Sequence, residues 1–107
     1  MYDKKELKPI YDKRNNFYKK AYVVFNNNNN IYFLSSYNTF VAYINEDGEV
    51  FITDNDKHLT HTTLRHIKEF LKQNSIKAES KKQILNDYKR VFIEQKPMEV
   101  QNNENII

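Results

Sequence analysis

The sequence predicts an α+β fold, with an antiparallel sheet of three to four strands followed by two helices in a single domain. Two observations predict this class. Short runs rich in Tyr, Val, Ile and Phe fill the first half of the chain, and apolar residues at helical spacing fill the second half. Strands grouped before helices are typical of α+β domains. We expect a polar N-terminal segment at 1–16, the domain at 17–93 and a flexible tail at 94–107.

Four β-rich runs predict the strands. The first run is 17–25, and the five asparagines that follow it predict a hairpin loop, because Asn tolerates positive φ. Two further runs, 31–34 and 39–44, lie on either side of a short polar break. The segment 45–49 contains Asp-Gly, a strong hairpin signal, and therefore predicts a turn before a return strand at 50–53.

Both faces of this predicted sheet are apolar or aromatic. Phe40, Ala42 and Ile44 alternate with Val41 and Tyr43, so both sets contain large apolar side chains. An antiparallel sheet with one solvated face alternates with polar residues instead. Two helices cover one face, and the other face needs a second cover. The N-terminal residues Leu7, Ile10 and Tyr11 are one candidate for this cover. The other is a partner or a second copy of the chain, since Tyr is enriched at interfaces.

Helical spacing predicts two helices. The first, with its entry, covers 60–74, can be capped by Thr60, Thr62 or Thr63, and has an apolar face formed by Leu64, Ile67, Phe70 and Leu71. The second begins at Ser80, where Ser80 and Gln83 match the capping box. Its expected apolar face consists of Ile84, Leu85, Tyr88, Val91 and Phe92.

Composition excludes several classes of function. The 107 residues include no Cys and one Gly, so no Cys-ligated metal site, disulfide framework or glycine-rich phosphate loop can form. No apolar run approaches the roughly 18 residues of a membrane span. The N-terminus lacks the apolar stretch of a secretory signal, so we expect a location in the bacterial cytoplasm and no membrane contact. The 14 lysines against three arginines indicate an AT-rich coding sequence.

Charge is segregated along the chain, although the net charge is only +3. Segments 1–20 and 57–93 carry net charges of +4 and +6, whereas 21–56 contains five acidic residues and no basic one. Such separation orients an approaching partner while the net charge stays small.

The inventory of reactive side chains is sparse. Asp54, Asp56, His58 and His61 lie close in sequence, and a metal-dependent enzyme at these residues is one hypothesis. However, no helical His-x-x-x-His pair, calcium-binding loop or glycine-flanked nucleophile is present. We therefore expect no catalytic residues, no metal and no cofactor.

Two segments, 36–44 (SYNTFVAYI) and 62–73 (TTLRHIKEFLKQ), resemble a family of small, largely uncharacterised proteins from phages and mobile elements of low-GC Gram-positive bacteria. The resemblance covers roughly 17–74 and implies no catalytic residue. It singles out the polar positions Ser36, Tyr37, Asn38, Thr39, Thr62, Thr63, Arg65 and His66. Small proteins of mobile elements often bind a host protein, and anti-CRISPR proteins are one such group.

The leading hypothesis is therefore a non-enzymatic protein that binds and inhibits a host protein, such as a CRISPR effector. The alternative is a nucleic-acid-binding accessory protein, with phosphates on a basic helical edge and bases on tyrosines of the open sheet face. A homodimer through that face is a further expectation. The expected partner-binding residues are Tyr22, Tyr32, Tyr43, Glu46, Asp47, Glu49, Arg65, Lys68 and Lys72.

Overall fold

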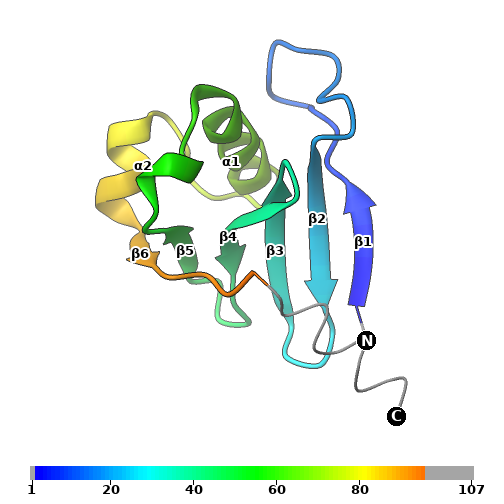
Figure 1. Cartoon of the computed structure of the whole chain (residues 1–107), viewed down its shortest axis with the longest axis vertical. Coiled ribbons are helices and arrows are strands. Elements are labelled where there is room, and N and C mark those ends of the chain that lie inside the picture. The colour runs from blue at the N-terminus through cyan, green and yellow to red at the C-terminus, as the bar shows by residue number, and fades with distance from the viewer. Residues whose placement is uncertain (1, 96–107) are drawn as a thin grey trace.

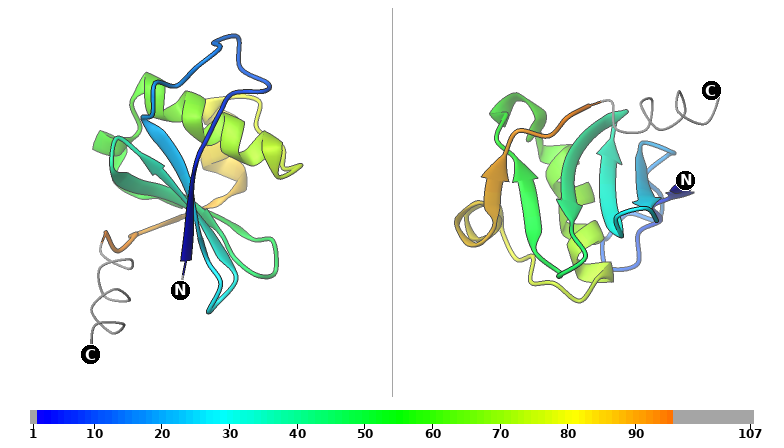
Figure 2. Two further views of the ribbon diagram at one scale, coloured as in Figure 1. Left: turned by 90° about the vertical axis from the view of Figure 1, so that its right-hand side faces the viewer. Right: turned by 90° about the horizontal axis from the view of Figure 1, so that it is seen from below.

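The computed structural model of the chain describes residues 2–95 and has a six-stranded sheet with both helices on one side (Figures 1 and 2). The predicted α+β class is confirmed, but the sheet has six strands instead of three to four. The elements are β1 (Tyr2–Glu6), β2 (Ala21–Asn26), β3 (Ile31–Ser36), β4 (Thr39–Ile44), β5 (Val50–Thr53), a 3-10 turn (Asp56–His58), α1 (His61–Gln73), α2 (Lys81–Asp87) and β6 (Lys89–Val91).

The strands lie in the sheet in sequence order, β1 to β6. The first five pair antiparallel with their neighbours, and β6 pairs parallel to β5. Parallel neighbours need a long crossover connection, which α1 and α2 supply here. The predicted turn between β4 and β5 is present, with Gly48 at a φ of 82°.

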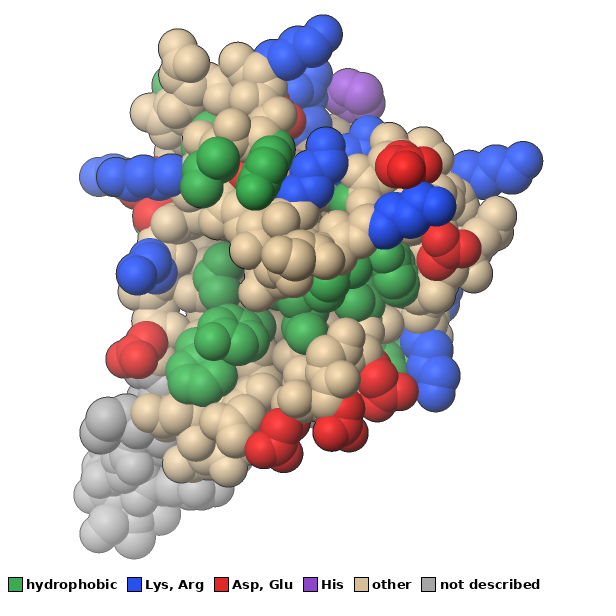
Figure 3. Space-filling model, turned by 180° about the vertical axis from the view of Figure 1, so that it is seen from behind, with side chains coloured by type: hydrophobic (Ala, Val, Ile, Leu, Met, Phe, Trp, Pro, Cys, Tyr) green, Lys and Arg blue, Asp and Glu red, His purple; other side chains and the backbone are tan. Residues whose placement is uncertain are grey.

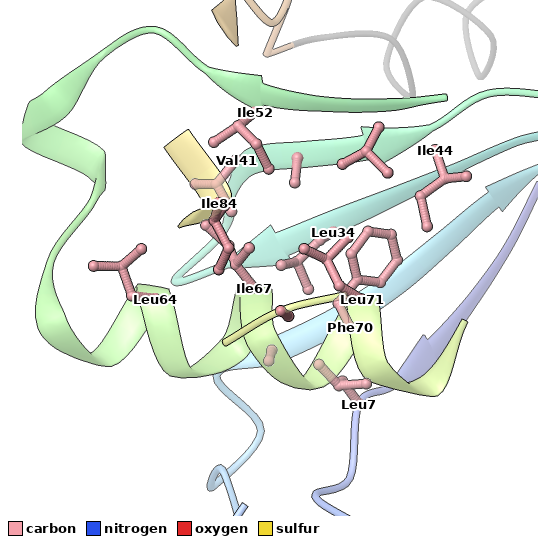
Figure 4. Close-up of a cluster of buried hydrophobic side chains, with 14 of the residues drawn as sticks. Leu7, Leu34, Val41, Ile44, Ile52, Leu64, Ile67, Phe70, Leu71 and Ile84 are labelled. Atoms are coloured by element: carbon pink, nitrogen blue, oxygen red, sulfur yellow. The ribbon is translucent and has the colours of Figure 1, made fainter. Parts of the chain in front are cut away.

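The main core lies between the helices and the sheet (Figure 4). Leu34 and Ile52 from the sheet meet Ile67, Phe70 and Leu71 from α1, and all five side chains are buried. Burying an aliphatic or aromatic side chain of this size stabilises a fold by roughly 1.5–3 kcal/mol. Thr60 caps α1 by accepting a hydrogen bond from the Thr63 amide at 3.2 Å, so this part of the prediction is confirmed.

The second helix begins as predicted but ends early. Ser80 Oγ accepts from the Gln83 amide at 3.1 Å, whereas α2 stops at Asp87 and does not extend to residue 92. The following residues form β6 on the free edge of β5, where the Arg90 Nε donates to the Thr53 carbonyl at 2.9 Å. Phe92 is 76% exposed. The expected helical apolar face is therefore wrong at Val91 and Phe92, because strand pairing replaces the last helical turns.

A β-bulge in β4 reverses one predicted side-chain direction. Leu34 pairs with Ala42 and Ser35 pairs with Phe40, so Val41 is an extra residue in β4. Val41 and Ala42 both join the main core, whereas Phe40 packs on the opposite face. The expectation that Phe40 shares a face with Ala42 and Ile44 is wrong for this reason.

The second sheet face is covered by the chain that follows β6, not by the N-terminal segment. Val24, Phe40 and Ile93 are buried there. The Gln95 side chain holds this cover in place, since its Oε1 accepts from the Phe40 amide at 2.8 Å and its Nε2 donates to the Phe40 carbonyl at 3.0 Å. Of the expected N-terminal cover, Leu7 belongs to the main core, and Ile10 and Tyr11 are exposed.

The loop 7–20 is fastened to α1 by a buried carboxylate. Glu69 accepts hydrogen bonds from the backbone amides of Ile10, Tyr11 and Asp12 at 2.9–3.2 Å. Gln73 Nε2 adds a fourth donor at 2.7 Å. The Glu69 side chain is 1% exposed, and these donors surround its carboxylate. This contact positions the loop beside the first turns of α1.

Replacing Glu69 by Gln should destabilise the fold by about 1–3 kcal/mol, because at least one buried backbone amide loses its acceptor. The free energy of unfolding in urea measures the effect. Glu79→Gln, at an exposed position, is the matched control and should change stability by less than about 0.5 kcal/mol. Equal effects of the two substitutions would contradict the anchoring role.

Candidate functional site

The charge segregation of the sequence becomes a spatial separation in the fold. On the helix-bearing side of the molecule, acidic side chains gather along one edge and most basic side chains lie away from it (Figure 3). The acidic edge belongs to the turn between β4 and β5, which contains Glu46, Asp47 and Glu49. This turn is therefore a local concentration of negative charge.

An apolar groove lies beside the acidic turn. It has a volume of about 500 Å³, and its apolar wall consists of Phe25, Tyr32, Ile44 and Ile76. The Phe25 and Tyr32 rings pack with centroids 4.5 Å apart. We call this feature the acidic-rimmed groove. It brings two of the predicted partner-binding residues, Tyr32 and Glu46, together in one lining.

The turn that forms the acidic rim is held by Asn45. Its Oδ1 accepts from the amides of Asp47 and Glu49 at 3.1 and 2.8 Å. Its Nδ2 donates to Glu49 Oε1 at 2.8 Å, and Asn30 Nδ2 donates to Glu46 Oε1 at 2.9 Å. Three exposed carboxylates are thereby concentrated on one short, ordered turn.

The three predicted tyrosines do not form one surface. Tyr22 and Tyr43 lie on the sheet face away from the helices, whereas Tyr32 lies on the helix-bearing face. Lys4 Nζ sits 4.4 Å from the centre of the Tyr22 ring. Tyr43 stacks on Phe51 with centroids 4.6 Å apart, and burial, followed by the charge of Glu49, raises the Tyr43 pKa above its usual value.

The predicted basic edge of α1 is present but partly neutralised. Arg65, Lys68 and Lys72 line one shallow hollow, together with Lys13 from the loop. Asp12 lies in the same hollow and pairs with Arg65 at 3.0 Å. The edge is therefore less positive than the helix sequence suggests.

Sequence reasoning missed a buried polar cluster between β3 and α1. Ser36 Oγ lies 2.8 Å from His66 Nδ1 and 2.9 Å from Thr63 Oγ1. These residues lie in the two segments 36–44 and 62–73 that carry the resemblance, and the resemblance was the one sequence signal that pointed to them. The contact between Ser36 and His66 joins residues 30 positions apart and cannot be derived from sequence spacing. The cluster ties α1 to β3.

The Ser36–His66 pair has the contact of a nucleophile and base, and both side chains are almost wholly buried. His66 is 1% exposed, and the Phe17 ring lies 4.6 Å from its ring. Burial, opposed by the charge of Asp12, lowers the His66 pKa from 6.5 to about 4. The imidazole is therefore neutral at physiological pH, and its contact with Ser36 ties α1 to β3.

The proposed metal ligands do not converge. Asp56 pairs with Arg90 and not with a second ligand. Within residues 2–95, no group of three Asp, Glu or His side chains is placed to hold a metal ion. In the same part of the chain, neither helix is long and apolar enough to cross a membrane.

Residues 5–86 match the DUF8033 family, whose description is "Family of unknown function". The match covers most of the chain, so the chain belongs to this family. No curated protein and no solved structure matches the chain. The family description names no activity or partner, and a host-protein target therefore stays a prediction.

The buried His66 makes stability depend on pH. The unfolded chain binds a proton at this imidazole near pH 6.5, whereas the folded chain binds it near 4, so stability falls as pH drops through this window. Between pH 6.5 and 5 the loss is on the order of 2 kcal/mol. Urea unfolding at several pH values measures it.

His66→Asn is the matched variant, because it keeps a polar atom near Nδ1 and removes the titrating ring. It should be less stable than the parent above pH 6.5, yet lose less stability between pH 6.5 and 5. An unchanged pH slope in this variant would show that other groups cause the dependence.

Proposed function

We propose that the chain is a non-enzymatic binding protein that docks its acidic-rimmed groove on a basic surface of a host protein and thereby inhibits that protein. The observation that supports this most strongly is the groove itself. It combines exposed aromatic surface with three carboxylates on an ordered turn. Exposed apolar surface rimmed by polar groups is typical of protein interaction sites.

The chemistry of the groove defines the partner. Residues 21–56 contain no Lys or Arg, so β2 to β5 and their turns contribute only negative charge to the groove. A complementary partner surface has an apolar side chain surrounded by Lys or Arg. The apolar side chain fits between Phe25, Tyr32 and Ile76, and the basic side chains meet the carboxylates of the rim. The nucleic-acid channel of a host protein has this basic character, and a chain seated there excludes the natural substrate.

The mechanism we propose is steric and electrostatic, not catalytic. Ser36 and His66, the pair with the contact of a nucleophile and base, are only 2% and 1% exposed. A CRISPR effector is the class of target that the resemblance suggests. Its guide-dependent cleavage is then the activity that the chain reduces.

Reversal of the three rim charges tests this proposal. The variant with Glu46→Lys, Asp47→Lys and Glu49→Lys should lose a partner that the parent chain captures from nuclease-treated bacterial lysate, because the introduced lysines repel the basic surface. Mass spectrometry identifies the captured proteins. The control variant carries Asp54→Lys, Glu79→Lys and Glu94→Lys, three exposed positions outside the groove lining with the same change in total charge.

The expected result is loss of a basic partner in the rim variant and its retention in the control. Thermal unfolding of both variants confirms that they are folded. Equal capture by the two variants would contradict docking through the groove. Nucleic acid alone, removed by the nuclease, would contradict a protein target and favour the accessory-protein alternative.

A further inference from the structure

Two left-handed turns lie side by side at the basic end of the molecule. Tyr18 and Lys19 have φ values of 54° and 59°, and Tyr37 and Asn38 have values of 51° and 65°. The Tyr37 amide donates to the Lys20 carbonyl at 2.8 Å and so joins the two turns. Tyr37 and Asn38 form the two-residue loop between β3 and β4, a hairpin turn that requires positive φ at both positions.

The turns present two tyrosines to solvent. Tyr18 is 70% exposed and Tyr37 is 50% exposed. The two turns place two aromatic rings around one hollow at the start of α1.

The hollow between these turns is basic. It has a volume of about 340 Å³, and Arg14, Lys20 and Arg65 line it together with both tyrosines. No acidic side chain lines it, although Asp12 pairs with Arg65 from the neighbouring hollow. The three cations and this one carboxylate leave a net charge of about +2 at physiological pH.

A second hollow continues the site on the other side of Tyr37. Its lining includes Thr39, Lys57, Thr60 and Thr62 as well as Tyr37. Tyr37 therefore forms a ridge with hydroxyl groups and one further cation beyond it. We call the two hollows together the tyrosine ridge site. An extended ligand that stacks on Tyr37 reaches cations on both sides.

We infer that the tyrosine ridge site binds single-stranded nucleic acid. Exposed aromatic rings provide stacking surfaces for unpaired bases, and Lys and Arg beside them neutralise the backbone phosphates. The hollow of about 340 Å³ has the volume of a pocket for one small ligand, and we assign it one nucleotide. Arg14 and Lys20 contact phosphates on one side of the ridge, and Lys57 contacts them on the other.

The tyrosine ridge site is distinct from the acidic-rimmed groove. The groove lies beside Asn74 at one end of α1, and the ridge lies beside Thr62 at the other end. A 13-residue helix is about 20 Å long, which exceeds the Debye length of about 8 Å at physiological salt. The carboxylates of the groove therefore do little to repel a polynucleotide at the ridge.

Binding of fluorescein-labelled dT12 and rU12 to the purified full chain tests the inference by fluorescence anisotropy. We expect binding at 50 mM NaCl that weakens at 200 mM, with a slope of log K against log salt near −2 for three phosphate contacts. Tyr18→Asn and Tyr37→Asn should each weaken binding roughly tenfold, because each removes one stacking surface. Asn tolerates positive φ, so these variants keep the turns.

Matched controls separate this site from the rest of the surface. Tyr11→Asn combined with Lys68→Ala alters the neighbouring α1 edge, and Tyr32→Asn alters the groove. Both controls should bind as the parent chain does. Arg14→Ala, a change at an exposed side chain, should weaken binding and reduce the salt slope even if a tyrosine variant proves unstable.

The outcomes distinguish the nature of the ligand. Equal affinity for dT12 and rU12 supports contacts to bases and phosphates alone, and tighter binding of rU12 supports contact of the threonine hydroxyls with the ribose. No binding of either probe at 50 mM NaCl would overturn the inference. Tyrosine variants that bind like the parent, with loss in the Tyr11–Lys68 control, would also overturn it.

Discussion

The hydrogen bonds between the Glu69 carboxylate and the amides of residues 10–12 hold the loop 7–20 against α1, and several other contacts depend on the position of this loop. The loop 7–20 contains no regular secondary structure, so it has no ladder of backbone hydrogen bonds of its own. The buried carboxylate supplies acceptors for three consecutive amides and fixes the path of this loop. Charge-assisted hydrogen bonds of this kind are stronger than neutral ones.

Features that lie far from Glu69 follow from this fixed path. Phe17, at the far end of the loop, covers His66 and keeps the imidazole neutral. Asp12 meets Arg65, and the turn at Tyr18 meets the turn at Tyr37. A loop held less firmly would leave the polar cluster of α1 and β3 in contact with water. The same contact therefore supports both the core and the basic end of the molecule.

Local signals in the sequence were sufficient for most individual elements. The Asp-Gly turn, the β4 and β5 runs and the Thr60 and Ser80 caps depend on neighbours within a few positions, and these features are present as predicted. Strand β1 was not predicted, because its sequence YDKKE is mostly charged and lacks the alternation of apolar residues that indicates a strand. Strand β6 has three residues, and it forms because the edge of β5 is free to pair.

The errors at the candidate sites arose where tertiary contacts override local pattern. The bulge at Val41 changes which face Phe40 occupies, and a two-residue period gives no sign of it. Tyr32 was expected on the open face with Tyr22, but the register places it beside Phe25 on the helix-bearing face. The Ser36–His66 contact joins residues that only the packing of α1 on β3 brings together.

The distribution of charge has a consequence for how the two proposed sites work together. A basic protein surface and a polynucleotide carry opposite charges, so the acidic-rimmed groove attracts the first and the tyrosine ridge site attracts the second. Because the sites lie at opposite ends of α1, binding at one leaves the other free. A host protein that holds a nucleic acid presents both charges at once. If both proposed sites bind as inferred, one end of the chain contacts the protein and the other contacts an unpaired strand, and the two contacts reinforce each other when the spacing matches. Because α1 packs on the sheet, its length sets the spacing between the two sites. That spacing decides which complexes of protein and nucleic acid both sites can contact at once.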